Sequence, residues 1–529
     1  LIVCKLHYRI FFFRHRRRFC CKVMSSSFPY DSNHLDISRR SIRALRASAA
    51  AAFELAPKQL PRIFFHGLIL SLIIAGFWLL DSLKDPVLAR ITGIEYQPVA
   101  KLFSVVVTFL VTCLYDFATS KLRKPDLFHL ISVFYGIAFM VLSAFLSDPE
   151  VGLQNMNKSS GRLVGWISYV MIETYGSLMV VLFWSFTNSL MNLEEAKGAY
   201  GLIISIAQIG AILGSTVATQ SISFGIPQLF LAGSMSIFSI SLLIKVYHIC
   251  FVLKAKTKIN YDDEFKEMMI DHGQGQGQGE NSEVNSEISA SNSFFSKFQG
   301  FSEGLFLIVK HRYMILVFGI SCSYEIVVTI LDYQFKILGA DASSSNNNGT
   351  EKNVVEQDEF ANLLGHFGQA TNVFSFLISF FGFSFLVHKI GVRNSLMIFP
   401  CVLFLAVLVT NLMPSLTCLF IAVSIIKALV FSLHDPVKEL LYIPTSVAIK
   451  FKAKAWIDVF GSRLAKAIGS FVTYIAYGDA TTLRTIAEVP CLVISLGVVY
   501  LAYLVGNEFQ KLVDNNIRIG ENSTTETKI

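Results

Sequence analysis

Charged residues are scarce in this 529-residue sequence, in which Asp, Glu, Lys and Arg together account for 16%. A soluble domain usually carries about 25% charged residues. Hydrophobic residues make up 53% of the chain and gather in runs as long as the roughly 20 apolar residues that cross a bilayer. The shortage of charge therefore excludes a soluble globular protein and predicts an integral membrane protein embedded in the lipid bilayer.

Motifs for nucleotide hydrolysis and for metal or disulfide sites are also absent. No GxxxxGK[ST] segment occurs, and the Gly/Gln repeat at 273–279 has no Lys-Ser/Thr pair after it, which argues against an ATP-driven pump. The nine cysteines include no CxxC pair, and most lie in apolar runs, as small buried hydrophobic residues do. We expect neither an enzyme nor a cofactor or metal site.

The apolar runs predict twelve membrane-spanning helices in two groups of six. The first group lies near 63–83, 98–117, 127–147, 162–191, 199–218 and 226–253, and the second near 313–335, 360–387, 394–412, 415–433, 455–477 and 485–505. The polar segment between the groups has the composition of a disordered linker. We expect an all-α membrane protein with a six-plus-six bundle like that of major facilitator transporters.

Basic residues indicate which connections face the cytoplasm, because cytoplasmic connections carry an excess of Lys and Arg. Outside the N-terminal segment, the basic positions that fall on one side are Lys121, Arg123, Lys124, Lys254, Lys256, Lys258, Lys389, Arg393, Lys450, Lys452 and Lys454. Two glycosylation-type triplets, Asn157-Lys158-Ser159 and Asn348-Gly349-Thr350, fall on the other side. Both termini are therefore expected in the cytoplasm.

These assignments divide the chain into five segments. The predicted segments are a basic N-terminal segment at 1–62, a six-helix half at 63–253, a cytoplasmic linker at 254–312, a second six-helix half at 313–505 and a cytoplasmic tail at 506–529. Met24 opens a polar stretch, and translation that begins there would leave the residues before it untranslated. Because the basic segment adjoins a span, we interpret it as a cytoplasmic flank and expect no nucleic-acid binding.

Ionisable residues interrupt the apolar runs at a few positions. Such a residue inside a span costs about 2.5–3.5 kcal/mol, so each is a candidate for a functional site. The candidates are Lys84 and Asp85 at the end of span 1, Glu173 near the middle of span 4, Asp332 and Lys336 at the end of span 7, Asp435 and Lys438 after span 10, and Arg463 and Lys466 within span 11. The residues at span ends are equally consistent with side chains that reach to the membrane surface.

A transporter of this architecture binds its substrate near the membrane midplane, between the two halves. A cavity that holds several Lys and Arg side chains, balanced by carboxylates, suits an anionic substrate. Ammonium and guanidinium groups bind phosphate through charge-assisted hydrogen bonds. The pattern therefore favours a carrier of phosphorylated or other organic anions.

The segments around these charges resemble a known family. The matching segments are Glu173–Ser177, Leu182–Asn188, Glu194–Lys197, Asp435–Pro444, Lys452–Val459 and Arg463–Ser470. They resemble the ATP/ADP translocase family, the nucleotide transporters of plastids and of bacterial and microsporidian intracellular parasites. The resemblance covers roughly 63–505 and points to a microsporidian-type member.

The resemblance implies which of the candidates bind substrate. The family's essential charges fall on Lys84, Glu173, Asp332 and Lys466, with Asp85, Lys336, Asp435, Lys438 and Arg463 as secondary candidates. This chain departs from the family pattern in having Pro86 after the first-helix pair, Asp332 in place of Glu, and one glycine fewer beside Lys466. These changes bear on which nucleotide is preferred.

The resemblance further implies that the chain exchanges ATP for ADP by alternating access. A proton-coupled symporter of purine nucleotides or of another organic anion is the alternative, and a receptor that has kept the fold but lost transport is a third hypothesis. ATP and ADP are the expected partners, with other purine nucleotides and phosphate as further substrates. The expected location is the plasma membrane of an intracellular parasite, with an organelle membrane second.

Overall fold

The computed structural model describes residues 59–122, 124–188, 190, 193–253, 304–345, 353–379, 383–446, 449, 453–515 and 517–520. The chain divides into two compact units, Leu1–Pro61 and Arg62–Ile529, and nearly all of the described residues belong to the second. Most of the predicted basic segment 1–62 and of the linker 254–312 lies outside the described residues, as does the end of the tail.

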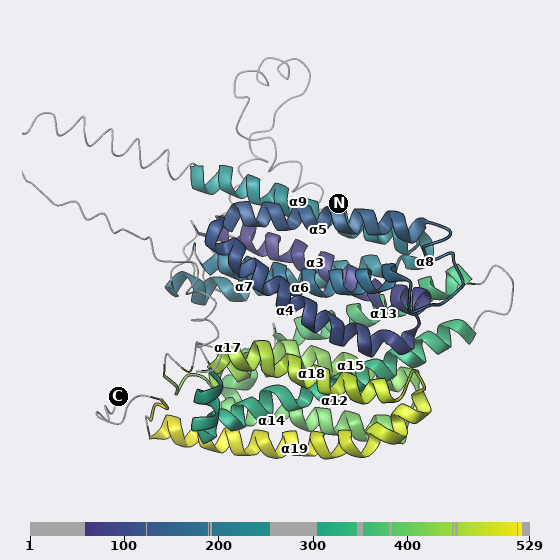
Figure 1. Cartoon of the computed structure of the whole chain (residues 1–529). Coiled ribbons are helices and arrows are strands. Elements are labelled where there is room, and N and C mark those ends of the chain that lie inside the picture. Colours follow the sequence, from purple (N-terminus) through teal and green to yellow (C-terminus); the bar gives the residue numbers. More distant parts are fainter. Residues whose placement is uncertain are drawn as a thin grey trace, which may run out of the picture. The chain divides into compact units, whose positions relative to one another are not determined.

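Helices make up almost all of the described chain. The first half comprises α3 (Leu60–Ile91), η1 (Ile94–Tyr96), α4 (Gln97–Lys121), α5 (Lys124–Ser147), α6 (Leu163–Asn188), α7 (Leu193–Ala218), α8 (Ser221–Phe224), α9 (Ile226–Tyr247) and the π-helical η2 (His248–Leu253). The second half comprises α12 (Arg312–Ser345), α13 (Asn353–Leu377), α14 (Phe383–Leu412), α15 (Leu416–Leu429), η4 (Val430–His434), α16 (Asp435–Leu440), α17 (Lys454–Trp456), η6 (Ile457–Gly461), α18 (Ser462–Ile475) and α19 (Ala480–Asp514). Figure 1 shows α3 to α9 gathered in its upper part and α12 to α19 mostly below them.

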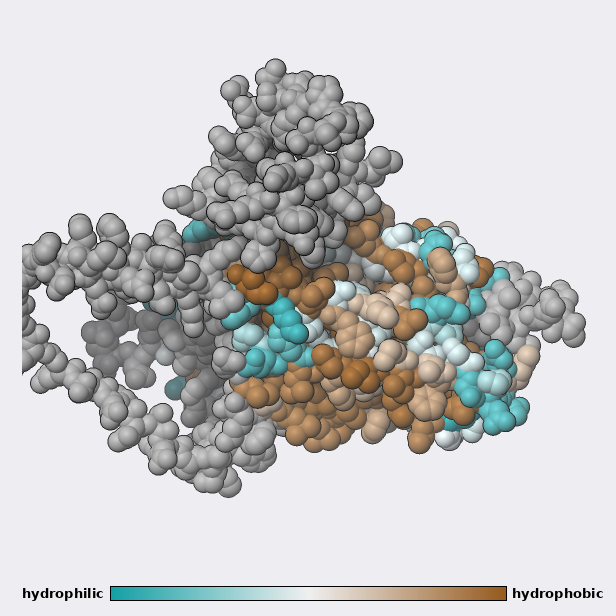
Figure 2. All heavy atoms as spheres, turned by 90° about the horizontal axis from the view of Figure 1, so that it is seen from above, coloured by the Kyte–Doolittle hydropathy of each residue, from teal (hydrophilic) through white to brown (hydrophobic). Residues whose placement is uncertain are grey.

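The predicted fold class, an all-α membrane protein, is confirmed. Nine helices in the described ranges are long and apolar enough to cross a membrane. On the face shown in Figure 2, hydrophobic residues cover broad areas, and many of the hydrophilic ones gather toward one end. The fifth, eighth and eleventh predicted spans fall on α7, α13 and the α17–α18 segment, which are not among the nine, so the count of twelve stays a prediction.

Two helices continue past the charges at which we predicted their ends. Span 1 was expected to end at residue 83 and span 7 at residue 335, whereas α3 runs to Ile91 and α12 to Ser345. Lys84, Asp85 and Lys336 lie inside these helices and are each no more than 7% exposed. The interpretation of these residues as surface-seeking helix ends is therefore wrong. Their charges are neutralised by ion pairs inside the bundle, so the helices do not have to stop there.

Other boundaries also differ from the prediction. The eighth span was expected at 360–387, but α13 ends at Leu377 and Phe383 already belongs to α14. Inside α14 the backbone of Gly391 has a positive φ of 81°, which interrupts the regular helix. Residues 304–310, assigned to the linker, are helical, and α19 extends beyond 505 to Asp514.

The two halves meet along α7 with α13 and along α4 with α18. Across the first contact, the side chain of Asn362 donates to the carbonyl oxygen of Thr219 at 2.5 Å, and that of Gln369 donates to Thr216 Oγ1 at 2.8 Å. The Ser221 hydroxyl donates to the carbonyl oxygen of Asp358 at 2.5 Å. These polar contacts are consistent with the low hydropathy of α13, because polar side chains of α13 face α7 and α8 across the boundary between the halves.

The same end of the bundle is joined by a second set of contacts. The Tyr333 hydroxyl on α12 donates to the carbonyl oxygen of Ile94 at 3.3 Å. The rings of Tyr96 and Tyr477 lie 6.5 Å apart, edge to face. Both sets of contacts lie toward the end of the bundle that the basic residues predict to face away from the cytoplasm.

Candidate functional site

Lys84 on α3 lies between two carboxylates from the first half. Its ammonium group is 2.5 Å from Asp81 Oδ1, one turn earlier on α3, and 2.5 Å from Glu173 Oε1 on α6. The ring of Tyr169, one turn before Glu173, lies 5.3 Å from the same ammonium group. The predicted candidates Lys84 and Glu173 are thus direct partners, and Asp81 is a further member of the group.

A second group of charges joins the two halves. The ammonium group of Lys336 on α12 lies 3.0 Å from Asp85 Oδ2 on α3 and 2.7 Å from Asp332 Oδ2. Lys427 on α15 contacts the other oxygen of Asp332 at 2.5 Å and lies 5.0 Å from the ring of Phe367. The predicted candidates Asp85, Asp332 and Lys336 therefore form one network. Lys427 was not predicted, although it lies within the tenth apolar run.

Lys466 is paired with a carboxylate that the sequence analysis did not single out. Its ammonium group lies 3.4 Å from Glu325 Oε1 on α12, and the Ser462 hydroxyl donates to the same oxygen at 3.0 Å. Glu325 lies near the middle of its predicted span, 313–335, as Glu173 does in span 4. This central position in an apolar run could have identified Glu325 as a candidate from the sequence. Asp332 lies with Lys336 and Lys427 instead.

Two further cations, Arg463 and Lys101, lie near these ion pairs. The Arg463 guanidinium on α18 donates to Ser177 Oγ on α6 at 3.4 Å, across the two halves. Lys101 on α4, which the sequence did not single out, interacts electrostatically with both Glu173 and Asp332. In the described part of the chain Lys101 has no ion pair. Eleven side chains from α3, α4, α6, α12, α15 and α18 thus form one charged cluster between the halves. They are Asp81, Lys84, Asp85, Lys101, Glu173, Glu325, Asp332, Lys336, Lys427, Arg463 and Lys466.

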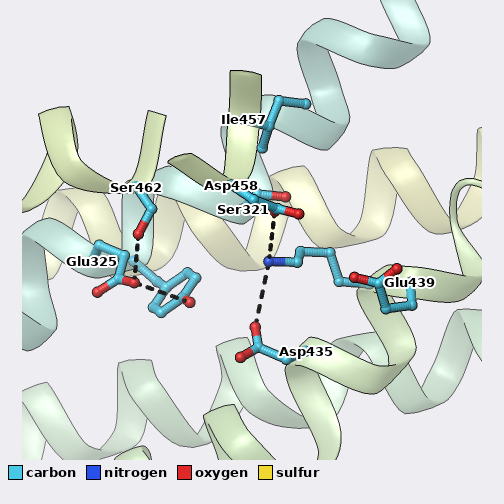
Figure 3. Close-up of a pocket in the computed structure, with 9 residues that line it drawn as sticks. Ser321, Glu325, Asp435, Glu439, Ile457, Asp458 and Ser462 are labelled. Carbon is cyan, nitrogen blue, oxygen red and sulfur yellow. Dashed lines mark hydrogen bonds and ion pairs between the residues drawn. The ribbon is translucent and has the colours of Figure 1, made fainter. Parts of the chain in front are cut away.

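A cavity of about 310 Å³ lies in the second half, and Figure 3 shows its lining. The ammonium group of Lys438 lies between Asp435 Oδ1 and Asp458 Oδ1, 3.4 Å from each. Asp435 directly follows the π-helical η4, and Asp458 lies in the π-helical η6. π-Helical turns are frequent at functional sites. The predicted secondary candidates Asp435 and Lys438 therefore belong to this cavity.

The remaining residues of the cavity connect it to the charged cluster. It is lined by Ser321, Tyr324, Glu325, Asp435, Lys438, Glu439, Ile457, Asp458 and Ser462. Glu325 contacts both Lys466 and the cavity, and Glu439 is paired with Lys454 at 2.7 Å. Among the described residues no group of three or more His, Cys, Asp or Glu side chains has the arrangement of a metal site.

A helical bundle whose two halves meet at an interior charged cluster is the architecture of a secondary membrane transporter. Solved transporter structures share this fold. The nucleoside transporter NupG aligns with a TM-score of 0.51 at 15% identity, over 84% of this chain and 99% of its own. A mutant of the peptide transporter POT in complex with alafosfalin aligns with a TM-score of 0.52 at 11% identity, over 83% and 95%. These likenesses concern the fold alone.

The family follows from the sequence match. Residues 39–509 match the family described as TLC ATP/ADP transporter, and the chain belongs to that family. The ADP,ATP carrier protein 4 of Rickettsia bellii is 22% identical over 502 residues, or 86% of this chain and 90% of its own. The ADP,ATP carrier protein 1 of Chlamydia pneumoniae is 23% identical over 335 residues, or 58% and 59%. The predicted family is confirmed, and the protein is a transporter rather than an enzyme.

Proposed function

We propose that this chain exchanges ATP for ADP across a membrane by alternating access. The observation that carries the proposal is the charged cluster, in which Lys84, Lys466 and Arg463 come together from both halves beside carboxylates. Lys and Arg hold phosphate groups through charge-assisted hydrogen bonds. Membership of the ATP/ADP transporter family and the names of the relatives support the nucleotide as cargo.

In this mechanism the carboxylates hold the lysines while the site is empty. Glu173 and Asp81 balance Lys84, Glu325 balances Lys466, and Asp332 balances two further lysines. Arriving phosphates replace the carboxylates as partners of Lys84 and Lys466. Rocking of the empty carrier would have to separate ion pairs such as the one between Asp85 and Lys336, which joins the two halves. An unpaired charge in a water-poor interior is costly, so the empty carrier reorients slowly. Bound phosphates supply replacement partners for the lysines, so the loaded carrier reorients easily. That asymmetry makes it an exchanger.

The contacts between the halves support a direction for the movement. Asn362 to Thr219 and Tyr333 to Ile94 close the end of the bundle that we place outside the cytoplasm. The halves at 63–253 and 313–505 then rock about the charged cluster, breaking these contacts to admit external nucleotide. We place both termini in the cytoplasm and the protein in the plasma membrane of a microsporidian-type parasite, with an organelle membrane as the alternative. Other purine nucleotides and phosphate are further substrates in this proposal.

Uptake of labelled ATP into proteoliposomes loaded with ADP tests the proposal. Wild-type protein should take up ATP at a rate well above that of protein-free vesicles. Lys466→Ala and Glu173→Gln should each abolish uptake while the protein still inserts into the bilayer. Full activity in either variant would overturn the site assignment, and absence of uptake in the wild type would overturn the proposed function.

A proton-coupled symport of nucleotides or of another organic anion is the second candidate, and the cavity around Lys438 favours it. Asp435 and Asp458 share this one lysine, so one carboxylate is left to bind a proton when the cavity closes. This hypothesis predicts that an inward proton gradient accelerates ATP uptake and that a protonophore removes the acceleration. Asp458→Asn should also remove it. Uptake that is indifferent to the gradient would exclude the symporter.

A further inference from the structure

The lysines of the charged cluster differ in how their charge is balanced. Lys84 and Lys336 each contact two carboxylates, and Lys427 and Lys466 each contact one. Lys101 contacts none within ion-pair distance in the described part of the chain. It lies in the second turn of α4 (Gln97–Lys121) and is only partly accessible.

Lys101 also lies near both ion-pair groups. It interacts electrostatically with Asp332 and Lys336 of one group, with Glu173 of the other, and with Lys466 of the second half. These residues come from α12, α6 and α18, and α4 packs against both α6 and α18. Lys101 therefore lies close to three of the four substrate-binding candidates, namely Glu173, Asp332 and Lys466.

An ammonium group without a carboxylate partner has a definite consequence in such an interior. Placing a lysine in an apolar span is costly, and an ion pair within the protein normally offsets part of that cost. Phosphates that approach Lys84 must first displace Asp81 and Glu173, whereas phosphates that approach Lys101 displace nothing. Lys101 is thus the lysine of the cluster that is most available to an incoming anion.

We propose that Lys101 binds the phosphate chain of the transported nucleotide and makes the binding strength depend on the number of phosphates. The proposal rests on the proposed function, because it assigns a residue and a substrate group to the same site. Lys101 holds the phosphate chain first, near both ion-pair groups. Lys84 and Lys466 then exchange their carboxylates for the nucleotide as the halves rock.

The test compares Lys101→Gln with the wild type in the ATP/ADP exchange assay. A hydrogen bond to a charged group contributes about 1.5–3 kcal/mol, so the KM for ATP and for ADP should rise roughly tenfold or more. The inhibition constants of competing AMP and adenosine should shift progressively less, because they offer fewer or no phosphate charges. Lys101→Arg, which keeps the positive charge, should retain most of the affinity.

A matched control is Lys511→Gln on α19, where the lysine side chain is 68% exposed and far along the chain from the cluster. This substitution should leave KM unchanged. Two results would show that Lys101 has only a structural role and would overturn the proposal. One is an inhibition constant for adenosine that rises by the same factor as the KM for ATP. The other is a fall in kcat with no change in KM. Failure of the wild type to exchange nucleotides would instead overturn the proposed function.

A measurement on wild-type protein covers the case in which Lys101→Gln does not fold. The protein in proteoliposomes is treated with an acetylating reagent, and the modified lysines are identified by mass spectrometry. Lys101 should be acetylated in the empty carrier. ATP should protect it, and adenosine at saturating concentration should not. Equal protection by ATP and adenosine would contradict phosphate binding by Lys101.

Discussion

Lys84 keeps its charge inside the bundle because two carboxylates, Asp81 and Glu173, lie 2.5 Å from its ammonium group. Removing one partner of a buried ion pair typically costs about 3–5 kcal/mol, because the other charge is left without compensation. Replacing both partners by apolar residues costs much less. The stability of the helical bundle and the binding of phosphate thus depend on the same three side chains.

We therefore expect Lys84→Met to abolish transport and also to destabilise the detergent-solubilised protein. Lys84→Met combined with Glu173→Met should recover much of the lost thermal stability without recovering transport. Thermal unfolding and ATP uptake, measured on the same preparations, separate the two effects. A double variant less stable than Lys84→Met alone would contradict a buried ion pair at this position.

Glu325 gives a second prediction at the residue scale, since it is the carboxylate that contacts Lys466. Glu325→Gln should reduce ATP uptake about as severely as Lys466→Ala does, because each leaves the other charge unpaired. Glu325→Asp, which keeps the charge on a shorter side chain, should retain measurable uptake. Normal uptake by Glu325→Gln would show that Lys466 does not depend on this partner.

At the scale of single helices, Asp358 near the start of α13 contributes to the contacts that close one end of the bundle, because its carbonyl oxygen accepts a hydrogen bond from the Ser221 hydroxyl. It is 8% exposed and precedes the predicted eighth span. Its carboxylate accepts a hydrogen bond from the backbone N–H of Ile226 at the start of α9, and burial raises its pKa to about 6. When the halves separate at this end and water reaches the carboxyl group, its pKa should return toward the ordinary value of about 3.9.

The sign of the resulting pH dependence follows from linkage. Between about pH 4 and pH 6 the closed state binds more protons than the open state, so the closed state is most stable at the acid end of this range and weakens as pH rises through 6. Exchange should therefore be slower at an external pH of about 5 than at about pH 7. Asp358→Asn should lose this difference; an unchanged pH profile in that variant would exclude Asp358 as its source.

Most helices could be predicted from the sequence, because runs of apolar residues determine which segments cross the membrane. The ends of α3 and α12 could not, because Lys84 and Lys336 interrupt the apolar pattern and each has a neutralising partner on another helix. For the same reason the sequence did not show that Lys466 pairs with Glu325 or that Lys101 has no ion-pair partner among the described residues. The sequence shows how far a charged residue lies from the ends of an apolar run. Which charged residues of different helices form ion pairs depends on how the helices pack, and the sequence does not show that.

At the scale of the whole molecule, exchange of ATP for ADP moves about one net negative charge in each cycle. One charge crossing a membrane is worth about 2.3 kcal/mol per 100 mV. An inside-negative potential should therefore slow ATP uptake against internal ADP, and an inside-positive one should accelerate it. Potassium diffusion potentials set with valinomycin provide the measurement. Indifference to the potential would mean that phosphate or protons cross with the nucleotides and cancel the charge.

The family, the fold and the charged cluster all support a carrier that reorients more easily when nucleotide is bound than when its site is empty. The most direct test is uptake of labelled ATP into proteoliposomes with and without ADP inside. We predict rapid uptake when internal ADP is present and uptake close to that of protein-free vesicles when it is absent. Equal uptake under both conditions would contradict exchange and the slow return of the empty carrier on which it depends.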